Sequence, residues 1–213
     1  MLAPPPAGRL YAIVDGDACA RANRAPLDVA RAFLSAGATL IQLRCKSLGS
    51  GAFLDLANAM MEFADAAGAA VIVNDRADIA ALSEAHGLHV GQEDLLPRDA
   101  RKVIGDLPLL GLSTHTREQW EAAVGEPVCY IAIGPVFGTG TKDTGYPAVG
   151  LETVHQAAAA AAHHGLPTVA IGGITRDNAA SVIAAGASSV AAIGDLVNGD
   201  PETQCRAFLA ALR

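Results

Sequence analysis

The stretch Thr39-Leu40-Ile41-Gln42-Leu43-Arg44-Cys45-Lys46 is a short apolar run that ends in polar side chains. An apolar run of this length predicts a buried strand. Comparable runs recur along the whole chain, at residues 10–14, 39–43, 70–73, 87–90, 109–112, 129–133, 168–171 and 189–193. The sequence therefore predicts eight strands, several of which end in polar residues.

Segments rich in alanine, leucine and charged residues lie between these runs, as is typical of helices. They comprise residues 26–36, 52–67, 117–124, 151–164, 176–185 and 201–212. Because the strands are continuously apolar, we expect both faces of the sheet to be covered, as in parallel sheets. Glycines at positions 37, 68, 165 and 186 are expected to end helices in the left-handed conformation.

Eight strand–helix units in 213 residues predict an α/β fold, a single-domain (β/α)8 TIM barrel over residues 1–213. Residues 1–8 are expected to form a flexible N-terminal extension. The alternative is a doubly wound open sheet. The barrel is favoured because the first strand is not followed by a Gly-x-Gly-x-x-Gly turn, and because polar residues follow seven strands instead of one switch point.

Composition excludes several classes of partner. The net charge is −7, and no basic cluster indicates a nucleic-acid surface. The start of the chain does not resemble an export signal, and no window approaches the length of a membrane span, so we expect no membrane association. The cysteines, Cys19, Cys45, Cys129 and Cys205, lack metal-type spacing and fit a reducing cytoplasm. Self-association is left open.

Gln42, Arg44 and Lys46 alternate in sequence, so in an extended segment their side chains share one face. Together they could hold a single anion. The alternative is a solvated strand end. Only three lysines occur in the chain, and two of them, Lys46 and Lys142, fall in expected strand-to-helix loops.

Asn74 and Asp75 follow the third strand, and Asp94 comes shortly after the fourth. Each aspartate alone would more commonly be a helix N-cap or a turn residue. Carboxylates at the ends of neighbouring strands can instead hold Mg²⁺, which prefers oxygen ligands. Their pairing favours the metal interpretation.

Ser113 follows the fifth strand, where its hydroxyl could bind a ligand or cap the next helix. His115, two residues later, invites a general-base interpretation, but a loop histidine is more often structural, and no nucleophile–base set surrounds it. The glycine-rich segment 134–142 ends in Lys142 but does not match a Walker motif, which disfavours a nucleotide hydrolase. Gly172-Gly173 and Ile193-Gly194 close the last two strands, where barrels commonly form a phosphate-binding cup; a tight turn is the alternative.

Taken together, these motifs resemble the thiamine-phosphate synthase family along most of the chain. The motifs are Gln42-x-Arg44-x-Lys46, Asn74-Asp75, Gly91-Gln92-Glu93-Asp94, Ser113-x-His115-Thr116, Gly134-Pro135-Val136-Phe137 with Thr139-x-Thr141-Lys142, and Gly172-Gly173-Ile174-Thr175. The resemblance implies that hydroxymethylpyrimidine diphosphate is joined to a thiazole phosphate, giving thiamine phosphate and pyrophosphate. Pyrophosphate would leave first, and the thiazole nitrogen would capture the resulting pyrimidine carbocation.

The resemblance also implies three sets of site residues. The pyrimidine diphosphate would be held by Gln42, Arg44, Lys46, Asn74, Ser113 and Lys142, of which Arg44, Ser113 and Lys142 would be catalytic. The thiazole phosphate would be held by Thr139, Gly140, Thr141, Gly173, Ile193 and Gly194. The cofactor Mg²⁺ would be held by Asp75 and Asp94.

Two positions depart from the family pattern. Cys45 stands where an acidic residue is often found, and Gly194 stands where a serine is common, so one phosphate contact is expected to be lost. Neither change removes a metal ligand, and we expect an active enzyme.

Two alternatives share the resemblance. The related thiazole tautomerases have a catalytic histidine at the position of Pro135 and do not keep the diphosphate-binding set. A non-catalytic thiazole-phosphate or thiamine-phosphate binding protein would be expected to lack Asp75, Asp94 or Lys142, all of which are present.

Overall fold

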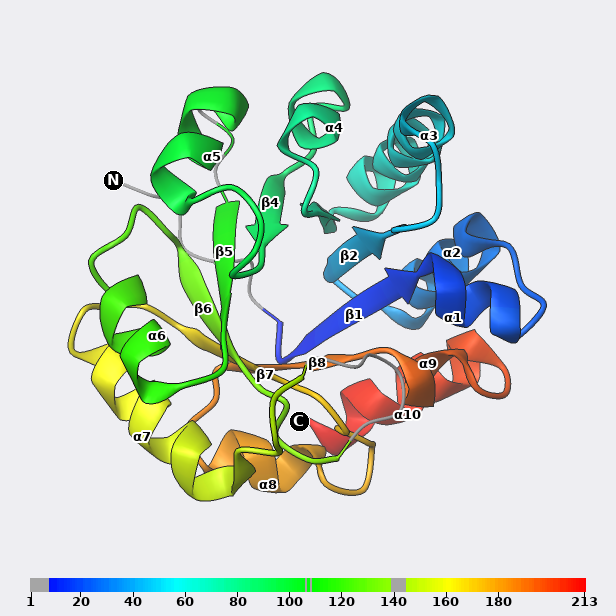
Figure 1. Ribbon diagram of the computed structural model, residues 1–213. Helices are drawn as coiled ribbons and strands as arrows, with labels where there is room; N and C mark the ends of the chain where they lie inside the picture. Colours follow the sequence, from blue (N-terminus) through cyan, green and yellow to red (C-terminus); the bar gives the residue numbers. More distant parts are fainter. Residues whose placement is uncertain (1–7, 106, 108, 139–144) are drawn as a thin grey trace.

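The chain folds into a closed barrel of eight parallel strands (Figure 1). The computed structural model describes residues 8–105, 107, 109–138 and 145–213. Each strand pairs with the next one in the sequence, and β8 pairs with β1 to close the ring. The strands are β1 Leu10–Asp15, β2 Leu40–Arg44, β3 Ala70–Asn74, β4 Gly87–Val90, β5 Leu109–Thr114, β6 Tyr130–Ile133, β7 Thr168–Ile171 and β8 Ser189–Ala192. The predicted TIM barrel is confirmed, and the open-sheet alternative is excluded.

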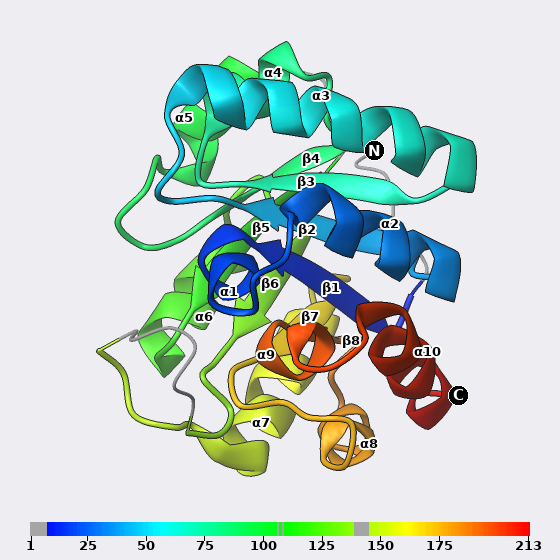
Figure 2. The ribbon, with the colours of Figure 1, turned by 90° about the vertical axis from the view of Figure 1, so that its right-hand side faces the viewer.

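Helices surround the barrel on its outside (Figure 2). They are α1 Gly16–Arg21, α2 Pro26–Ala36, α3 Ser50–Ala67, α4 Ala77–Leu82, α5 Pro97–Ile104, α6 Arg117–Ala123, α7 Gly150–Ala162, α8 Ala179–Ala184, α9 Gly194–Val197 and α10 Pro201–Ala211. All six predicted helical segments are present. The helices α1, α4, α5 and α9 were not predicted; each spans eight residues or fewer, a length that gives little periodic signal, and of the described helices this short only α6 and α8 were predicted.

Helix ends follow the local chemistry of the sequence. Gly37 caps α2 with φ of 98° and Gly68 caps α3 with φ of 65°, a conformation that glycine adopts without the steric cost of a Cβ atom. Gly165 and Gly186 also have positive φ, so all four predicted left-handed glycines are confirmed. Asp200 accepts a hydrogen bond from the amide of Thr203 (2.9 Å) and fixes the start of α10.

The core has two layers. The larger cluster fills the space between strands and helices, with Phe33 and Phe208 fully buried within it. A smaller cluster lies inside the barrel and includes Tyr11, Ile72 and Tyr130. Because both faces of every strand are buried, the strands are continuously apolar in sequence.

The first residues of the chain lie mostly outside the described part. Of the expected N-terminal extension, only Gly8 is described, and its carbonyl accepts a hydrogen bond from Ser189 Oγ (2.7 Å). None of the described helices is both long enough and apolar enough to cross a membrane.

Candidate active site

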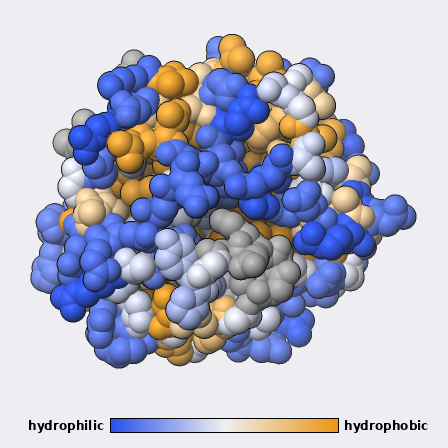
Figure 3. All heavy atoms as spheres, in the orientation of Figure 1, coloured by the Kyte–Doolittle hydropathy of each residue, from blue (hydrophilic) through white to orange (hydrophobic). Residues whose placement is uncertain are grey.

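The carboxyl ends of all eight strands lie at one end of the barrel, where (β/α)8 enzymes carry their active sites. In the face seen in Figure 1, hydrophilic side chains gather across the centre of the molecular surface (Figure 3). The described residues predicted to form the site lie within the last three residues of a strand or in the loop that follows it, with Gly194 at the first residue of the next helix. Of the predicted set, Thr139, Gly140, Thr141 and Lys142 lie outside the described residues.

Arg44, at the end of β2, forms an ion pair with Asp15 at the end of β1. Asp15 is 1% exposed, and its other carboxylate oxygen accepts a hydrogen bond from the amide of Ala18 (2.7 Å), which caps α1. The guanidinium is thereby fixed in place by a buried carboxylate and still has further N–H donors to offer. The sequence interpretation did not include Asp15, although it follows an apolar run just as the predicted site residues do.

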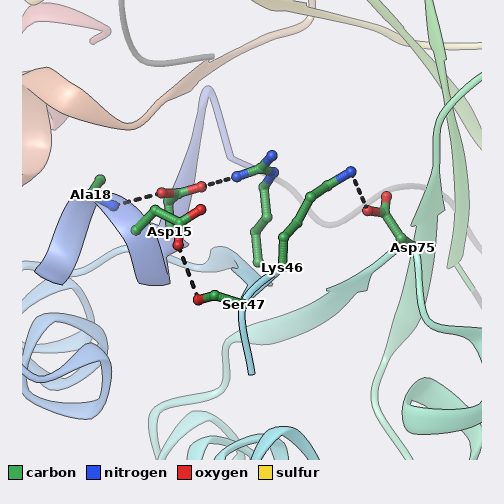
Figure 4. A network of polar contacts seen from close by, with 7 residues as sticks. Asp15, Ala18, Lys46, Ser47 and Asp75 are labelled. Carbon is green, nitrogen blue, oxygen red and sulfur yellow. Dashed lines mark hydrogen bonds and ion pairs between the residues drawn. The ribbon is translucent and has the colours of Figure 1, made fainter. Parts of the chain in front are cut away.

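Lys46, beyond the end of β2, reaches the adjacent strand. Its Nζ lies 3.0 Å from Oδ2 of Asp75 (Figure 4). Asp75 has φ of 63°, and its amide donates to the carbonyl of His89 (2.8 Å) on β4. The backbone therefore aims this carboxylate at the rim. Asn74, the last residue of β3, is 8% exposed.

Asp94 lies in the loop after β4, and its Oδ2 accepts a hydrogen bond from the amide of Gly91 (2.7 Å). Burial raises the pKa of the Asp94 carboxyl, and the nearby Asp75 carboxylate raises it further. The residues that begin α4 and α5 are preceded by Arg76 and Leu96, so neither aspartate is a helix N-cap. The N-cap alternative for both is therefore wrong.

The Asp75–Asp94 pair fits a hard divalent cation. It offers carboxylate oxygens, and a bound cation would offset both the burial of the Asp94 carboxylate and its repulsion by Asp75, the two causes that raise the Asp94 pKa. Within the described ranges no group of three or more His, Cys, Asp or Glu is placed to hold a metal. The remaining ligands of such a cation would have to be water or substrate oxygens, which is the usual situation for Mg²⁺.

Several of the predicted site residues line three hollows. A cavity of about 360 Å³ is lined by Ser113 and His115 together with Gly173, Ile193 and Gly194. A second hollow of about 190 Å³ is lined by Lys46, Asn74 and Asp75, and a third of about 530 Å³ by Asp75 and Asp94, each with further residues. Asp75 borders both the second and the third hollow, so the Asp75 and Asp94 carboxylates and the Lys46 cation face one region.

Gly172 and Gly173 form one wall of the 360 Å³ cavity. They have φ of 98° and 62°, and added Cβ atoms would lie 2.5 Å from Cα of Pro135 and 2.6 Å from the carbonyl oxygen of Gly138, respectively. The Gly172 carbonyl accepts a hydrogen bond from the amide of Phe137 (3.0 Å). The glycines therefore make a turn and also seat the segment after β6 against the end of β7.

Asp195 on α9 also lines this cavity. Its Oδ2 accepts a hydrogen bond from the amide of Arg176 (2.9 Å) and so ties α9 to the loop after β7. Gly194, the position at which a serine was expected, is the first residue of α9.

Cys45, the other departure from the expected pattern, is 5% exposed. A Cβ atom added at Gly16 would lie 3.0 Å from Cys45 Sγ, so the thiol packs against the start of α1. Burial raises the pKa of this thiol to about 12, and it stays neutral at ordinary pH. It therefore fills space beside Arg44 without adding charge.

Ser113 borders the 360 Å³ cavity, and its Oγ lies 2.8 Å from Nε2 of His89. Helix α6 is capped by Thr116 with Gln119, so the helix-cap alternative for Ser113 is wrong. His115 donates from Nδ1 to the carbonyl of Gly134 (2.5 Å) and stacks on Tyr146, with ring centroids 4.2 Å apart. These contacts agree with the structural interpretation of this histidine.

Three buried residues beneath the rim were not identified as site residues from the sequence: Tyr11, His89 and Tyr130. The Tyr11 and Tyr130 hydroxyls lie 3.0 Å apart, and Tyr130 Oη lies 2.9 Å from Nδ1 of His89. The Tyr130 ring crosses the space that a side chain at Gly111 would fill, since a Cβ atom there would overlap the ring. In the sequence these tyrosines look like ordinary core residues, because they lie within apolar runs.

A closed parallel barrel with cations, carboxylates and a glycine-walled cavity at the carboxyl ends of its strands defines a TIM-barrel enzyme. Residues 10–196 match the family model described as thiamine monophosphate synthase. The chain is 40% identical over 206 residues to a thiamine-phosphate synthase of Roseiflexus castenholzii, covering 96% of this chain and 89% of that protein. It is 45% identical over 176 residues to a thiamine-phosphate synthase of Moorella thermoacetica, covering 82% of each.

A solved structure gives the same result. A thiamine phosphate pyrophosphorylase from Pyrococcus furiosus superposes with a TM-score of 0.85 and 26% identity, covering 96% of this chain and 95% of that one. The chain belongs to the thiamine-phosphate synthase family, and it is a transferase of thiamine biosynthesis.

Proposed function

We propose that this transferase joins 4-amino-2-methyl-5-hydroxymethylpyrimidine diphosphate to 4-methyl-5-(2-hydroxyethyl)thiazole phosphate, or to its carboxylated precursor with loss of CO₂. The products are thiamine phosphate and pyrophosphate. The observation that carries this proposal is the arrangement of Lys46, Asp75 and Asp94 beside a separate cavity that Gly173 and Gly194 line. One region suits a diphosphate with its cation, and the other suits the second substrate.

The pyrimidine diphosphate is assigned to Gln42, Arg44, Lys46, Asn74, Ser113 and Lys142. Arg44 and Lys46 supply positive charge to it. Arg44 is fixed by Asp15 before substrate arrives, so little reorganisation is needed when negative charge develops on the leaving group. Lys46, whose side chain is half exposed, can move from Asp75 to a phosphate oxygen.

The thiazole phosphate is assigned to Gly173, Ile193 and Gly194, which border the 360 Å³ cavity, and to Thr139, Gly140 and Thr141. Glycine at these positions lets a phosphate group approach main-chain amides closely. Such placement would hold the thiazole nitrogen facing the reacting carbon of the pyrimidine.

Mg²⁺ is assigned to Asp75 and Asp94. When bound, it would neutralise charge on the departing pyrophosphate. The chain's own contribution is to orient the two carboxylates, through the main-chain bonds of Asp75 to His89 and of Asp94 to Gly91. Arg44, Ser113 and Lys142 then act on the substrate itself, and no nucleophilic side chain is required.

A thiazole tautomerase is the second candidate. The resemblance places the catalytic histidine of that branch at Pro135, which borders the 360 Å³ cavity and has no group that can transfer a proton. The presence of the Lys46–Asp75 pair and of Asp94 favours the synthase. All four cysteines are buried in the thiol form, which supports a cytoplasmic location.

The proposal is tested by incubating the purified protein with both substrates and Mg²⁺ and detecting products by mass spectrometry. Thiamine phosphate is expected. Isomerised thiazole phosphate without thiamine phosphate would establish the tautomerase instead. Bound but unchanged thiazole phosphate would indicate a binding protein.

A further inference from the structure

Five side chains form a continuous row of hydrogen bonds across the inside of the barrel. Gln42 Nε2 donates to Tyr11 Oη (2.8 Å), and Tyr11 Oη lies 3.0 Å from Tyr130 Oη. Tyr130 Oη lies 2.9 Å from His89 Nδ1, and His89 Nε2 lies 2.8 Å from Ser113 Oγ. The row thus joins Gln42 to Ser113, two residues assigned to the same substrate, through three buried residues that have no assigned role.

The first bond fixes the direction of the others. The amide Nε2 of Gln42 is a donor only, so Tyr11 accepts from it. The Tyr11 side chain is 1% exposed, and its hydroxyl proton is directed to its other partner, Tyr130. Tyr130, having accepted that proton, donates its own to Nδ1 of His89. Nδ1 of His89 is therefore unprotonated and accepts the hydrogen bond from Tyr130, and the ring proton lies on Nε2.

The last bond transmits this direction to the cavity. A protonated Nε2 donates to Ser113 Oγ, and the hydroxyl proton of Ser113 is then directed toward the cavity that Ser113 borders. We propose that Tyr11, Tyr130 and His89 are positioning residues that set the tautomer of His89 and thereby hold Ser113 as a hydrogen-bond donor to the substrate. The substrate atom that Ser113 meets is an acceptor, such as a diphosphate oxygen or a ring nitrogen. The expected effect of these residues on turnover rests on the proposed function, whereas the expected tautomer of His89 does not.

The surroundings support the row. Burial raises the pKa of Tyr11 and of Tyr130 above the ordinary value for tyrosine, so both remain protonated donors at neutral pH. The His89 and Tyr130 rings stack, with centroids 5.6 Å apart, which limits rotation of the imidazole. Gly111 provides the space through which the Tyr130 ring crosses the barrel.

The tautomer can be measured directly on the full chain without substrate. Nitrogen-15 NMR of the histidine rings distinguishes a protonated from a bare nitrogen, and His89→Gln identifies the His89 signals among the six histidines. A proton on Nε2 and a bare Nδ1 are expected. A proton on Nδ1 would mean that the row runs from Ser113 to Gln42, and a mixture of tautomers would mean that the row has no fixed direction; either result overturns the proposal.

Tyr130→Phe keeps the ring and removes the link to His89. A mixed His89 tautomer is expected, with kcat about tenfold lower and KM for thiazole phosphate unchanged. Tyr146→Phe is the matched control, because its hydroxyl bonds Gln119 near the surface, and it should leave the His89 signals unchanged.

Non-additivity provides the last test. If Tyr130 acts through Ser113, adding Ser113→Ala to Tyr130→Phe should lower kcat no further than Ser113→Ala alone. Independent, additive losses would contradict the proposal.

Wild-type protein without turnover but with the expected tautomer would refute the proposed function and leave the direction of the row standing. If Tyr130→Phe does not fold, the His89 tautomer of the wild-type protein, measured by nitrogen-15 NMR, alone decides whether the proposal holds.

Discussion

The Nζ atom of Lys46 lies 3.0 Å from Oδ2 of Asp75, so the loop after β2 is tied to the end of β3 by one ion pair. The Lys46 side chain is 50% exposed. Ion pairs of such exposure contribute about 0–1 kcal/mol to stability. Little free energy is therefore lost when Lys46 leaves Asp75 and binds a substrate phosphate instead.

Lys46→Gln should change the free energy of unfolding by less than about 1 kcal/mol while lowering turnover with the pyrimidine diphosphate. Urea denaturation and steady-state kinetics measure the two effects. Lys102→Gln is the matched control, because Lys102 forms a similar exposed pair with Asp99 on α5, away from the rim. Equal turnover losses in the two variants would remove Lys46 from the site.

Asp75→Asn and Asp94→Asn should each lower turnover on the order of a hundredfold while leaving thiazole-phosphate binding nearly unchanged, because they remove charge from the assigned metal pair only. Kinetics across a Mg²⁺ titration and calorimetric binding of thiazole phosphate provide the comparison. Asp78→Asn serves as the control, since that exposed carboxylate pairs with Arg76. Unchanged turnover of both site variants at saturating Mg²⁺ would refute the metal assignment.

The raised pKa of Asp94 predicts how stability depends on pH. An acid whose pKa is higher in the folded state binds more protons when folded, so its contribution favours folding at low pH and is lost as pH rises through the folded pKa. In Mg²⁺-free buffer, Asp94→Asn should therefore raise Tm at neutral pH. The gain should shrink in acid, where the wild-type carboxyl is protonated. A gain that is independent of pH would show that the charge is not its cause.

Gly111→Ala should destabilise the fold by about 1–3 kcal/mol or more, because the added methyl group overlaps the Tyr130 ring and overpacks the barrel interior. Gly51→Ala is the matched control: it lies in α3 with nothing within 4 Å of an added Cβ atom. This control should stabilise by about 0.5–1 kcal/mol. Chemical denaturation gives both values, and a neutral Gly111→Ala would mean that the Tyr130 ring is not confined there.

The barrel could be predicted from the sequence because every strand is a continuous apolar run and the major helices are long enough to show their composition. Short helices such as α4 and α9 could not, since one or two turns carry little periodic signal. Placing polar residues at strand ends was sufficient to identify Lys46, Asp75 and Ser113 as rim residues. The same rule applied to residue 15 would have found Asp15.

The row from Gln42 to Ser113 could not be predicted in this way. Both faces of a barrel strand are apolar, so the sequence does not show that Tyr11 and Tyr130 face the barrel interior and meet there. That encounter depends on strand register, which pairs Gly111 with Tyr130 on neighbouring strands and leaves room for the ring.

The central claim is that the rim residues use Mg²⁺ to release pyrophosphate as the two substrates are joined. It is tested most directly by measuring pyrophosphate and thiamine phosphate together in one reaction, with and without a chelator. Equal amounts of both products that disappear with the chelator are predicted. Undiminished product in the presence of the chelator, or no thiamine phosphate at any Mg²⁺ concentration, would contradict the account.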